Sequence, residues 1–442
     1  MNPSDTYSYS ALAGKAWPLI LANASVPLLG LVDTAVVGNT GTLQDLGAIA
    51  FGALIFSFVY WSFGFLRMGT TGFIARASGA GERDELRAIL GRALLIGGSL
   101  GCTIVVMQGL IGFIALGLLD GTPQVEAVTG IYFYIRVWGA PATLMGFALM
   151  GVLVGLGESR KLLALQVFLN GSNAVLDVYF AGYLGWGAAG IATGTLLAEW
   201  CTLFFGLYLV IPLLRDRDGA GPYWNLQQVF ARDKLLGTLS ANADIMIRTL
   251  LLVFSFAFFT NQSARFGDTV LAANHILLQF VSFSAFFLDG YAFVAESLSG
   301  QAHGAGNSSA FDTAVRRTSI LALGTACILS LLVLTGGEMA AQMLTDFPVV
   351  RNEAQTLLPM AALYILLSFG AFQLDGVFIG TSATRQMLYA AILSTGVFLL
   401  AWALLTGLYG VWGLWAAMII FVVARALALG LFYPALRRGI GT

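Results

Sequence analysis

Charged residues are scarce in this chain, and their scarcity excludes an ordinary water-soluble fold. Asp, Glu, Lys and Arg make up 10% of its 442 residues, whereas 58% are hydrophobic and the mean hydropathy is +0.83. A soluble protein could not cover such a composition with a polar surface. The composition therefore predicts an integral membrane protein.

Cysteine and histidine are also scarce. There are three cysteines and two histidines, and the cysteines all lie in apolar segments. An odd number of cysteines in such places argues against a disulfide framework and against a zinc site. The chain has no Walker-type GxxxxGK[ST] pattern and no reactive cluster of His or Cys. We therefore expect no enzyme activity and no cofactor, and an ion gradient as the source of energy.

Apolar stretches long enough to cross a bilayer recur along nearly the whole chain. About 20 helical residues cross ~30 Å of hydrocarbon, and barrel strands would be shorter and alternating. The first stretch runs past any plausible cleavage site, so we expect it to remain as a helix. We predict an all-α protein with twelve spans, at residues 15–39, 47–73, 92–117, 129–156, 161–184, 187–213, 236–262, 270–299, 316–336, 355–381, 386–408 and 411–436.

Lys and Arg are distributed unevenly between alternate loops. Sixteen of the 22 lie in loops on the side of the amino terminus, and the opposite loops hold Arg265 and Arg351. The positive-inside rule then places both termini in the cytoplasm, which requires an even number of spans. We expect a multi-pass protein of the cell's inner membrane.

One displacement, of 225 residues, repeatedly superimposes the chain on itself. The segment Gly151–Arg160, GVLVGLGESR, matches Gly376–Arg385, GVFIGTSATR, and Arg92 matches Arg317. Gly-rich helices can look alike under any shift, but here arginines recur as well. Six spans separate the matching positions, so the halves share one orientation, as in the parallel repeats of transporters. We predict two six-helix bundles, at 1–214 and 235–442, joined by a cytoplasmic linker at 215–234.

Ionisable residues inside predicted spans are costly and are functional candidates by default. Asp33, Asp177 and Thr193 each lie roughly 10 Å below the outer surface, at ~1.5 Å of helix per residue. Asn173 precedes Asp177 by four residues and shares its face. A low-dielectric site disfavours a charged carboxylate and so favours loading of a proton near neutral pH. Asp33, Asn173, Asp177 and Thr193 are our candidate coupling-ion site; the alternative is a polar cluster that fixes helix packing.

The second half carries a different set of buried charges. Arg248 lies near mid-depth, and Asp244 precedes it by four residues, a spacing that allows an ion pair. We expect a secondary network of Arg248, Asp289, Glu296 and Asp375. It either neutralises charge and closes the inner side or, at Asp375, faces the cavity. Arg136 and Arg425 are expected to snorkel or to cap a carbonyl.

Several segments together resemble one family. PLLGLVDTAVVG, FLRMGTTGFIARASGAG, NADIMIRTLLL, LDGYAFVAESLSGQAHGAG and LDGVFIGTSATRQ are similar to the DinF branch of the multidrug and toxic compound extrusion (MATE) transporters. The resemblance runs through both halves. It implies a V-shaped pair of six-helix bundles that exports organic cations and amphipathic drugs in exchange for protons or sodium.

The resemblance also implies roles for particular residues. In this branch the first bundle carries an acid in helix one, an Asn and an Asp in helix five and a Thr in helix six. These fall on Asp33, Asn173, Asp177 and Thr193, with Thr195 a near alternative for the last. Sodium, if it replaces the proton, would use the same four residues. The sister branch uses carboxylates of helices seven and ten; Asp375 matches the second, whereas Arg248 stands at the first.

The expected partners are cationic or amphipathic small molecules and the lipid bilayer, with no nucleic acid, and the chain is expected to act as a monomer. Proline 27, two turns before Asp33, supplies a weak point where the first helix could bend during transport. A lipid-linked oligosaccharide flippase of the same wider superfamily is the alternative function. Such a flippase would be expected to have a strongly cationic cavity, whereas this chain has a net charge of −1.

Overall fold

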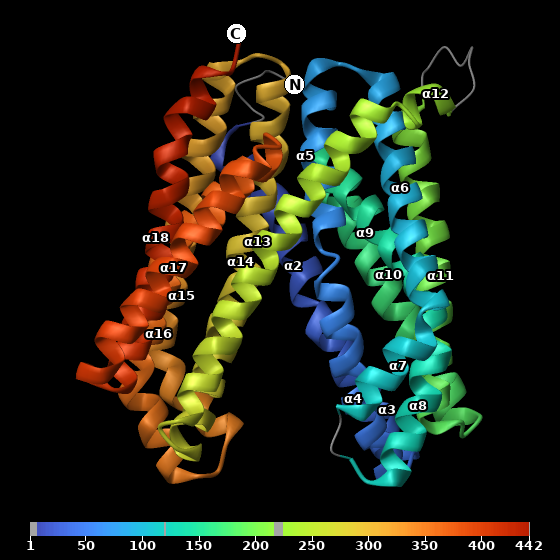
Figure 1. Ribbon diagram of the computed structural model, residues 1–442, viewed down its shortest axis with the longest axis vertical. Helices are drawn as coiled ribbons and strands as arrows, with labels where there is room; N and C mark the ends of the chain where they lie inside the picture. Colours follow the sequence, from blue (N-terminus) through green and yellow to red (C-terminus); the bar gives the residue numbers. More distant parts are fainter. Residues whose placement is uncertain (1–6, 119–120, 216–223, 442) are drawn as a thin grey trace. The chain divides into compact units, whose positions relative to one another are not determined.

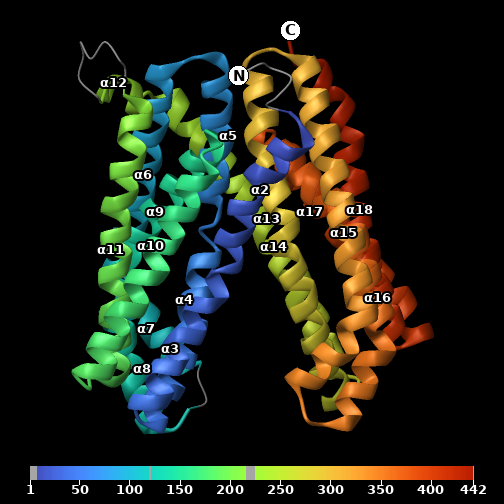
Figure 2. The same cartoon turned by 180° about the vertical axis from the view of Figure 1, so that it is seen from behind.

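The computed structural model describes residues 7–118, 121–215 and 224–441, and over these residues the chain is helical without a β-strand (Figures 1 and 2). The all-α prediction is therefore confirmed. The chain divides into two compact units, which we describe separately. The C-terminal unit comprises Met1–Ile20, Gly79–Gly81 and Ser240–Thr442, and the N-terminal unit comprises Leu21–Ser78 and Glu82–Leu239. The division falls within helix α2, Tyr9–Ala24.

The helices that lie wholly or mainly in the N-terminal unit are shorter than those of the C-terminal unit and are often interrupted. They are α3 (Val26–Thr40), α4 (Leu43–Trp61), α5 (Phe65–Ala80), α6 (Arg83–Val106), α7 (Gln108–Gly117), α8 (Pro123–Arg136), the 3₁₀ turn η1 (Val137–Gly139), α9 (Ala140–Gly155), α10 (Ser159–Asp177), the π-helical turn η2 (Val178–Tyr183), α11 (Gly187–Leu214) and α12 (Leu226–Val229).

The C-terminal unit contains longer, continuous helices. They are α13 (Arg232–Ala264), whose first residues belong to the other unit, α14 (Asp268–Gly304), α15 (Ser308–Leu344), α16 (Pro348–Gly380), α17 (Thr384–Tyr409) and α18 (Val411–Arg438). The start of α2 and the end of α18 lie at the same end of this unit (Figure 1). The guanidinium of Arg317 donates a hydrogen bond of 2.7 Å to the carbonyl of Tyr7, and Ile440 packs near Phe311. Both chain ends are thus attached to the start of α15.

Ten helical stretches of the described residues are long and apolar enough to cross a membrane. They match ten of the twelve predicted spans. The remaining two predictions, 15–39 and 161–184, correspond to α2 with α3, which form a broken helix, and to α10 with η2, which carry many polar side chains. The count of twelve therefore stays a prediction. So do the domain boundaries, because residues 216–223 of the predicted linker lie outside the described part of the chain.

Side chains at the helix ends determine where several elements begin. Thr42 accepts a hydrogen bond from the backbone of Asp45, and the carboxylate of Asp45 accepts one from the backbone of Thr42. This reciprocal cap satisfies two backbone donors at the start of α4. The same carboxylate accepts a hydrogen bond of 2.9 Å from the backbone of Ala188, which ties α4 to the start of α11.

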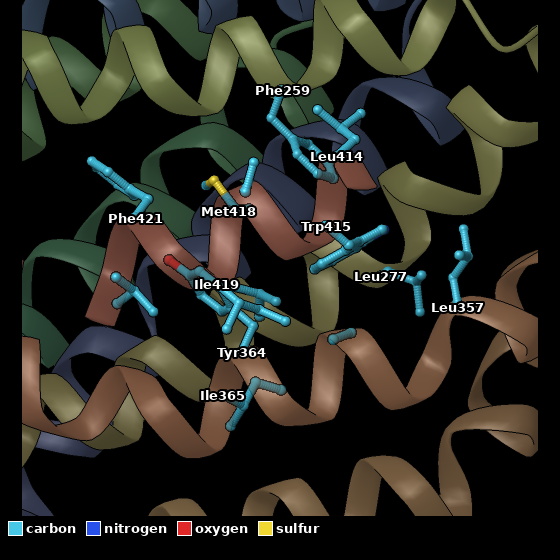
Figure 3. Close-up of a cluster of buried hydrophobic side chains, with 14 of the residues drawn as sticks. Phe259, Leu277, Leu357, Tyr364, Ile365, Leu414, Trp415, Met418, Ile419 and Phe421 are labelled. Carbon is cyan, nitrogen blue, oxygen red and sulfur yellow. The ribbon is translucent and has the colours of Figure 1, made fainter. Parts of the chain in front are cut away.

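The core of the C-terminal unit is a cluster of large apolar side chains from α13, α14, α16 and α18 (Figure 3). The rings of Phe259 and Trp415 meet edge to face, with 5.0 Å between their centroids. The indole of Trp415 donates a hydrogen bond of 2.9 Å to Asn274, and the amide of Asn274 donates one of 2.8 Å to Ser263. Burial of these rings, with their polar atoms paired, fixes how the four helices pack.

Candidate functional site

A polar stripe along α10 forms the centre of the candidate site. Asn170, Asn173 and Asp177 are spaced by three and four residues, so they lie on one face of the helix. Asn173 and Asp177 are fully buried. Helices α3 and α11 both contact α10, and the three lie side by side in both views of the fold (Figures 1 and 2). Each residue of the stripe meets a different partner on these neighbours.

The first partner is the break between α2 and α3. Pro27 lies in the first turn of α3, where its missing N–H interrupts the helical hydrogen bonds. The amide of Asn170 donates hydrogen bonds to the carbonyl and to the hydroxyl of Ser25, at 3.1 and 2.8 Å. Asn170 therefore provides a donor for backbone that the break leaves without its regular partner.

The second partner is a threonine of α11. The amide of Asn173 donates a hydrogen bond of 3.0 Å to the hydroxyl of Thr195, which is buried and in turn donates to the carbonyl of Ile191. Thr193 is half-buried and donates to the carbonyl of Ala189 on its own helix. Of the two threonines considered from the sequence, the structure brings Thr195 rather than Thr193 to Asn173.

The third partner is the carboxyl group of Asp33. The carboxyl groups of Asp33 and Asp177 lie side by side, close enough for one to donate a hydrogen bond to the other when it carries a proton. Asp33 is 8% exposed and Asp177 is fully buried. Among the described residues, neither carboxylate oxygen of Asp177 has a hydrogen-bond donor. Two adjacent buried carboxylates repel each other unless a proton or another cation lies between them.

Close packing of α11 against α10 and η2 depends on two glycines. A Cβ at Gly190 would lie 2.7 Å from the backbone nitrogen of Ala181, and one at Gly194 would collide with the carboxylate of Asp177. Directly after Asp177 the chain widens into the π-helical turn η2. Such turns are frequent at functional sites, because they change the direction of the side chains around them.

Two further charged residues lie beside this pair, although the sequence argument had set Arg136 aside. Arg136 ends α8, and its guanidinium donates a hydrogen bond of 2.8 Å to the hydroxyl of Tyr132. It forms an ion pair of 3.9 Å with Glu199 of α11 and interacts electrostatically with Asp33 and Asp177. Both residues had been recognised as intramembrane charges; their common location could not be derived from depth alone.

The buried charges of the C-terminal unit are arranged differently. Arg248 of α13 donates a short hydrogen bond to Asp375 of α16, and Arg425 of α18 lies 3.5 Å from the same carboxylate oxygen. All three are at most 7% exposed. Two arginines thus hold one carboxylate, which argues against a free cation-binding acid at Asp375. Arg425, expected to snorkel or to cap a carbonyl, is instead an ion-pair partner.

The remaining acids predicted for this unit have other surroundings. The hydroxyl of Thr384 donates a hydrogen bond of 3.0 Å to Asp244, so Asp244 does not serve as the i, i+4 partner of Arg248. Asp289 and Glu296 both lie on α14, where Glu296 is buried and Asp289 half-buried, and each makes contacts of its own. The structure therefore joins two of the four predicted members, Arg248 and Asp375, and adds Arg425.

Comparison with known proteins identifies the family. A family model described as MatE matches residues 18–179 and 245–404. The matches end at residues 179 and 404, which are 225 residues apart, so the parallel repeat predicted at this displacement is confirmed.

Individual relatives agree. DNA damage-inducible protein F of Escherichia coli K12 is 34% identical to this chain over 96% of its length and 92% of the relative's. A probable multidrug resistance protein NorM of Xanthomonas campestris pv. campestris is 25% identical over 94% and 92%. The Vibrio cholerae MATE transporter VcmN in its bent form has the same fold, with a TM-score of 0.87, 22% identity and coverage of 99% and 98%. The chain belongs to the MATE family and is a membrane transporter, related to the DinF branch.

Proposed function

We propose that this transporter is a secondary antiporter, which exports organic cations and other amphipathic drugs in exchange for protons. In this proposal Asp33 and Asp177 carry the proton, while Asn173 and Thr195 hold Asp177 in place on α10. The protein works in the cell's inner membrane with both termini in the cytoplasm. Sodium would be the alternative coupling ion at the same residues.

The observation that carries the proposal is the adjacency of the carboxyl groups of Asp33 and Asp177 in a buried site. One proton shared between them removes their mutual repulsion and supplies the donor that Asp177 lacks among the described residues. An organic cation removes the same repulsion by adding a positive charge. Proton and cation therefore compete for one site, which is the requirement for exchange.

The balance of charge in the N-terminal unit supports a cationic substrate. Three buried acids, Asp33, Asp177 and Glu199, lie near one arginine, Arg136. When all four are ionised, the cluster is anionic and attracts cations. A relative named as a probable multidrug resistance protein is consistent with drug export.

The break at Ser25 supports a way for the first helix to respond. Asp33 lies two turns after the break, on α3, so a change in its charge acts on a helix that can move separately from α2. We propose that protonation lets α3 repack against α10 and displaces the drug. The protein then exposes the site to the other side, releases the proton and accepts substrate again.

An efflux assay in cells tests this function. Cells that express the protein are loaded with a fluorescent cationic dye, and the pH gradient and the sodium gradient are collapsed separately. We expect efflux to stop when the pH gradient is lost and to continue when the sodium gradient is lost. Efflux that depends on sodium alone would replace the proton by sodium, and lipid translocation without dye efflux would favour a flippase.

A further inference from the structure

Arg136 is the one buried cation that the structure places among the acids of the proposed site in the described part of the N-terminal unit, and its neighbours come from several helices. Its guanidinium carbon lies 4.6 Å from the centroid of the Phe56 ring, a cation–π distance. The ionisable groups that face it are Asp33 of α3, Tyr60 of α4, Tyr132 of α8, Asp177 of α10 and Glu199 of α11. Such an arginine could neutralise the acids around it.

The geometry directs Arg136 toward Glu199 and Tyr132. It donates a hydrogen bond of 2.8 Å to Tyr132 and lies 3.9 Å from Glu199, whereas no ion pair within 4 Å joins it to Asp33 or Asp177 among the described residues. Gly139 makes room for Glu199, because a Cβ at this position would collide with its carboxylate. The backbone of η1 therefore determines where Glu199 lies, and Glu199 helps to determine where Arg136 lies.

The C-terminal unit shows what an arginine does to a buried acid without such a restraint. There Arg248 donates directly to Asp375, and Arg425 lies 3.5 Å from the same oxygen. The carboxylate of Asp375 is neutralised within the unit, and a cation would have to compete with two arginines. The acids Asp33 and Asp177 have no guanidinium at such a distance among the described residues.

We infer that Glu199 is a positioning residue, which holds Arg136 away from Asp33 and Asp177 so that their carboxyl groups stay available to an exported monovalent cation. This inference rests on the proposed function, because it assumes that the two aspartates bind the substrate. It adds a residue pair that determines how tightly they bind it. Arg136 weakens cation binding by its charge, and Glu199 limits that effect.

The inference predicts opposite effects for the two partners. Removing Arg136 takes away a positive charge near the aspartates, so a cation should bind more tightly. Removing the charge of Glu199 frees Arg136 to approach the aspartates, so a cation should bind more weakly. A unit charge about 10 Å away, at an effective dielectric constant of ~20, changes an affinity by about tenfold. A purely structural pair would weaken binding in both variants.

Equilibrium binding of tetraphenylphosphonium, a monovalent organic cation, to the purified full-length protein in detergent tests this order. At one fixed pH we expect Arg136→Gln to lower the Kd by about tenfold and Glu199→Gln to raise it by a similar factor. The double variant should bind like Arg136→Gln, because Glu199 acts through the arginine. Arg437→Gln, which removes an exposed cation of the C-terminal unit, is the matched control and should bind like the wild type.

Two more variants keep the test decisive if a glutamine variant does not fold. Glu199→Asp retains the charge on a shorter side chain and should give a Kd between those of the wild type and Glu199→Gln. Arg136→Lys retains the positive charge and should stay near the wild type. Weaker binding in both Arg136→Gln and Glu199→Gln, or no change in either, would overturn the inference. Wild-type binding that is insensitive to Asp33→Asn would instead overturn the proposed site itself, so the two failures are distinguishable.

Discussion

The side-chain amide of Asn173 donates a hydrogen bond of 3.0 Å to the hydroxyl of Thr195, and both residues are buried. This bond joins α10 to α11 one turn before Asp177. It fixes the rotation of α10 about its axis, and therefore the direction in which the carboxyl group of Asp177 points.

Replacement of Thr195 by valine should reduce transport. Thr195→Val keeps the shape of the side chain but leaves the Asn173 amide without its acceptor. A hydrogen bond of this kind contributes about 1 kcal/mol, so we expect drug efflux per folded molecule to fall by about fivefold. The matched variant Thr193→Val loses only a bond to its own helix and should transport close to the wild type. Equal loss in both variants would contradict the role given to Thr195.

Replacement of Gly194 by alanine should displace Asp177. The added Cβ would collide with the carboxylate of Asp177 and approach its backbone nitrogen to 3.1 Å. Overpacking of this kind costs about 1–3 kcal/mol, so we expect a lower melting temperature and weakened efflux. Gly171→Ala on α10 is the control, since a Cβ there meets nothing within 4 Å. That variant should be as stable as the wild type or slightly more stable. A stable, fully active Gly194→Ala protein would show that the contact is unimportant.

The sequence was sufficient to predict the stripe on α10 but not the choice of threonine. Spacing of three and four residues places Asn170, Asn173 and Asp177 on one helical face without any structure. Thr193 and Thr195 differ by about 3 Å in depth, so depth could not separate them. They differ by about 200° around the helix, at 3.6 residues per turn, and only the packing of α11 against α10 shows which one faces Asn173.

Replacement of Asp33 by asparagine should abolish proton-coupled efflux while leaving expression intact. Asparagine keeps the size of the side chain but cannot bind or release a proton near neutral pH. We expect dye efflux to fall to the level of cells without the protein, at unchanged protein amount in the membrane. Asp346→Asn removes an exposed carboxylate of the C-terminal unit and should remain active. Full activity of Asp33→Asn would remove this residue from the mechanism.

Replacement of Asp375 by asparagine should affect stability more than coupling. The change leaves Arg248 and Arg425 without their shared counter-ion in a buried place, which costs about 3–5 kcal/mol. We expect a clear drop in melting temperature. Efflux per folded molecule should keep the dependence on pH and sodium gradients found in the wild type. A change of coupling ion in this variant would assign Asp375 to the ion site.

The buried charges illustrate why part of the site could not be predicted. Sequence shows which charges lie inside spans, and it correctly drew attention to Asp33, Asp177, Arg248 and Asp375. It suggested Asp244 for Arg248 because only neighbours on one helix can be paired from spacing. The observed partner, Asp375, is 127 residues away and is reached through packing of α13 against α16.

The first helix shows the same limit. Its apolar length and Pro27 predicted a span with a weak point, and the structure has a break at Ser25. The partner of the break, Asn170, is 145 residues away along the chain. No local pattern relates the two.

The central claim is that one cation and the proton compete for the carboxyl groups of Asp33 and Asp177. Proteoliposomes with a pH-sensitive dye in the lumen, in sodium-free buffer, test it most directly when ethidium is added outside. We expect the lumen to become alkaline as ethidium enters and protons leave. Vesicles with Asp33→Asn, and vesicles without protein, should show no such change. Ethidium uptake without a change in lumenal pH, or uptake that requires sodium, would contradict the account.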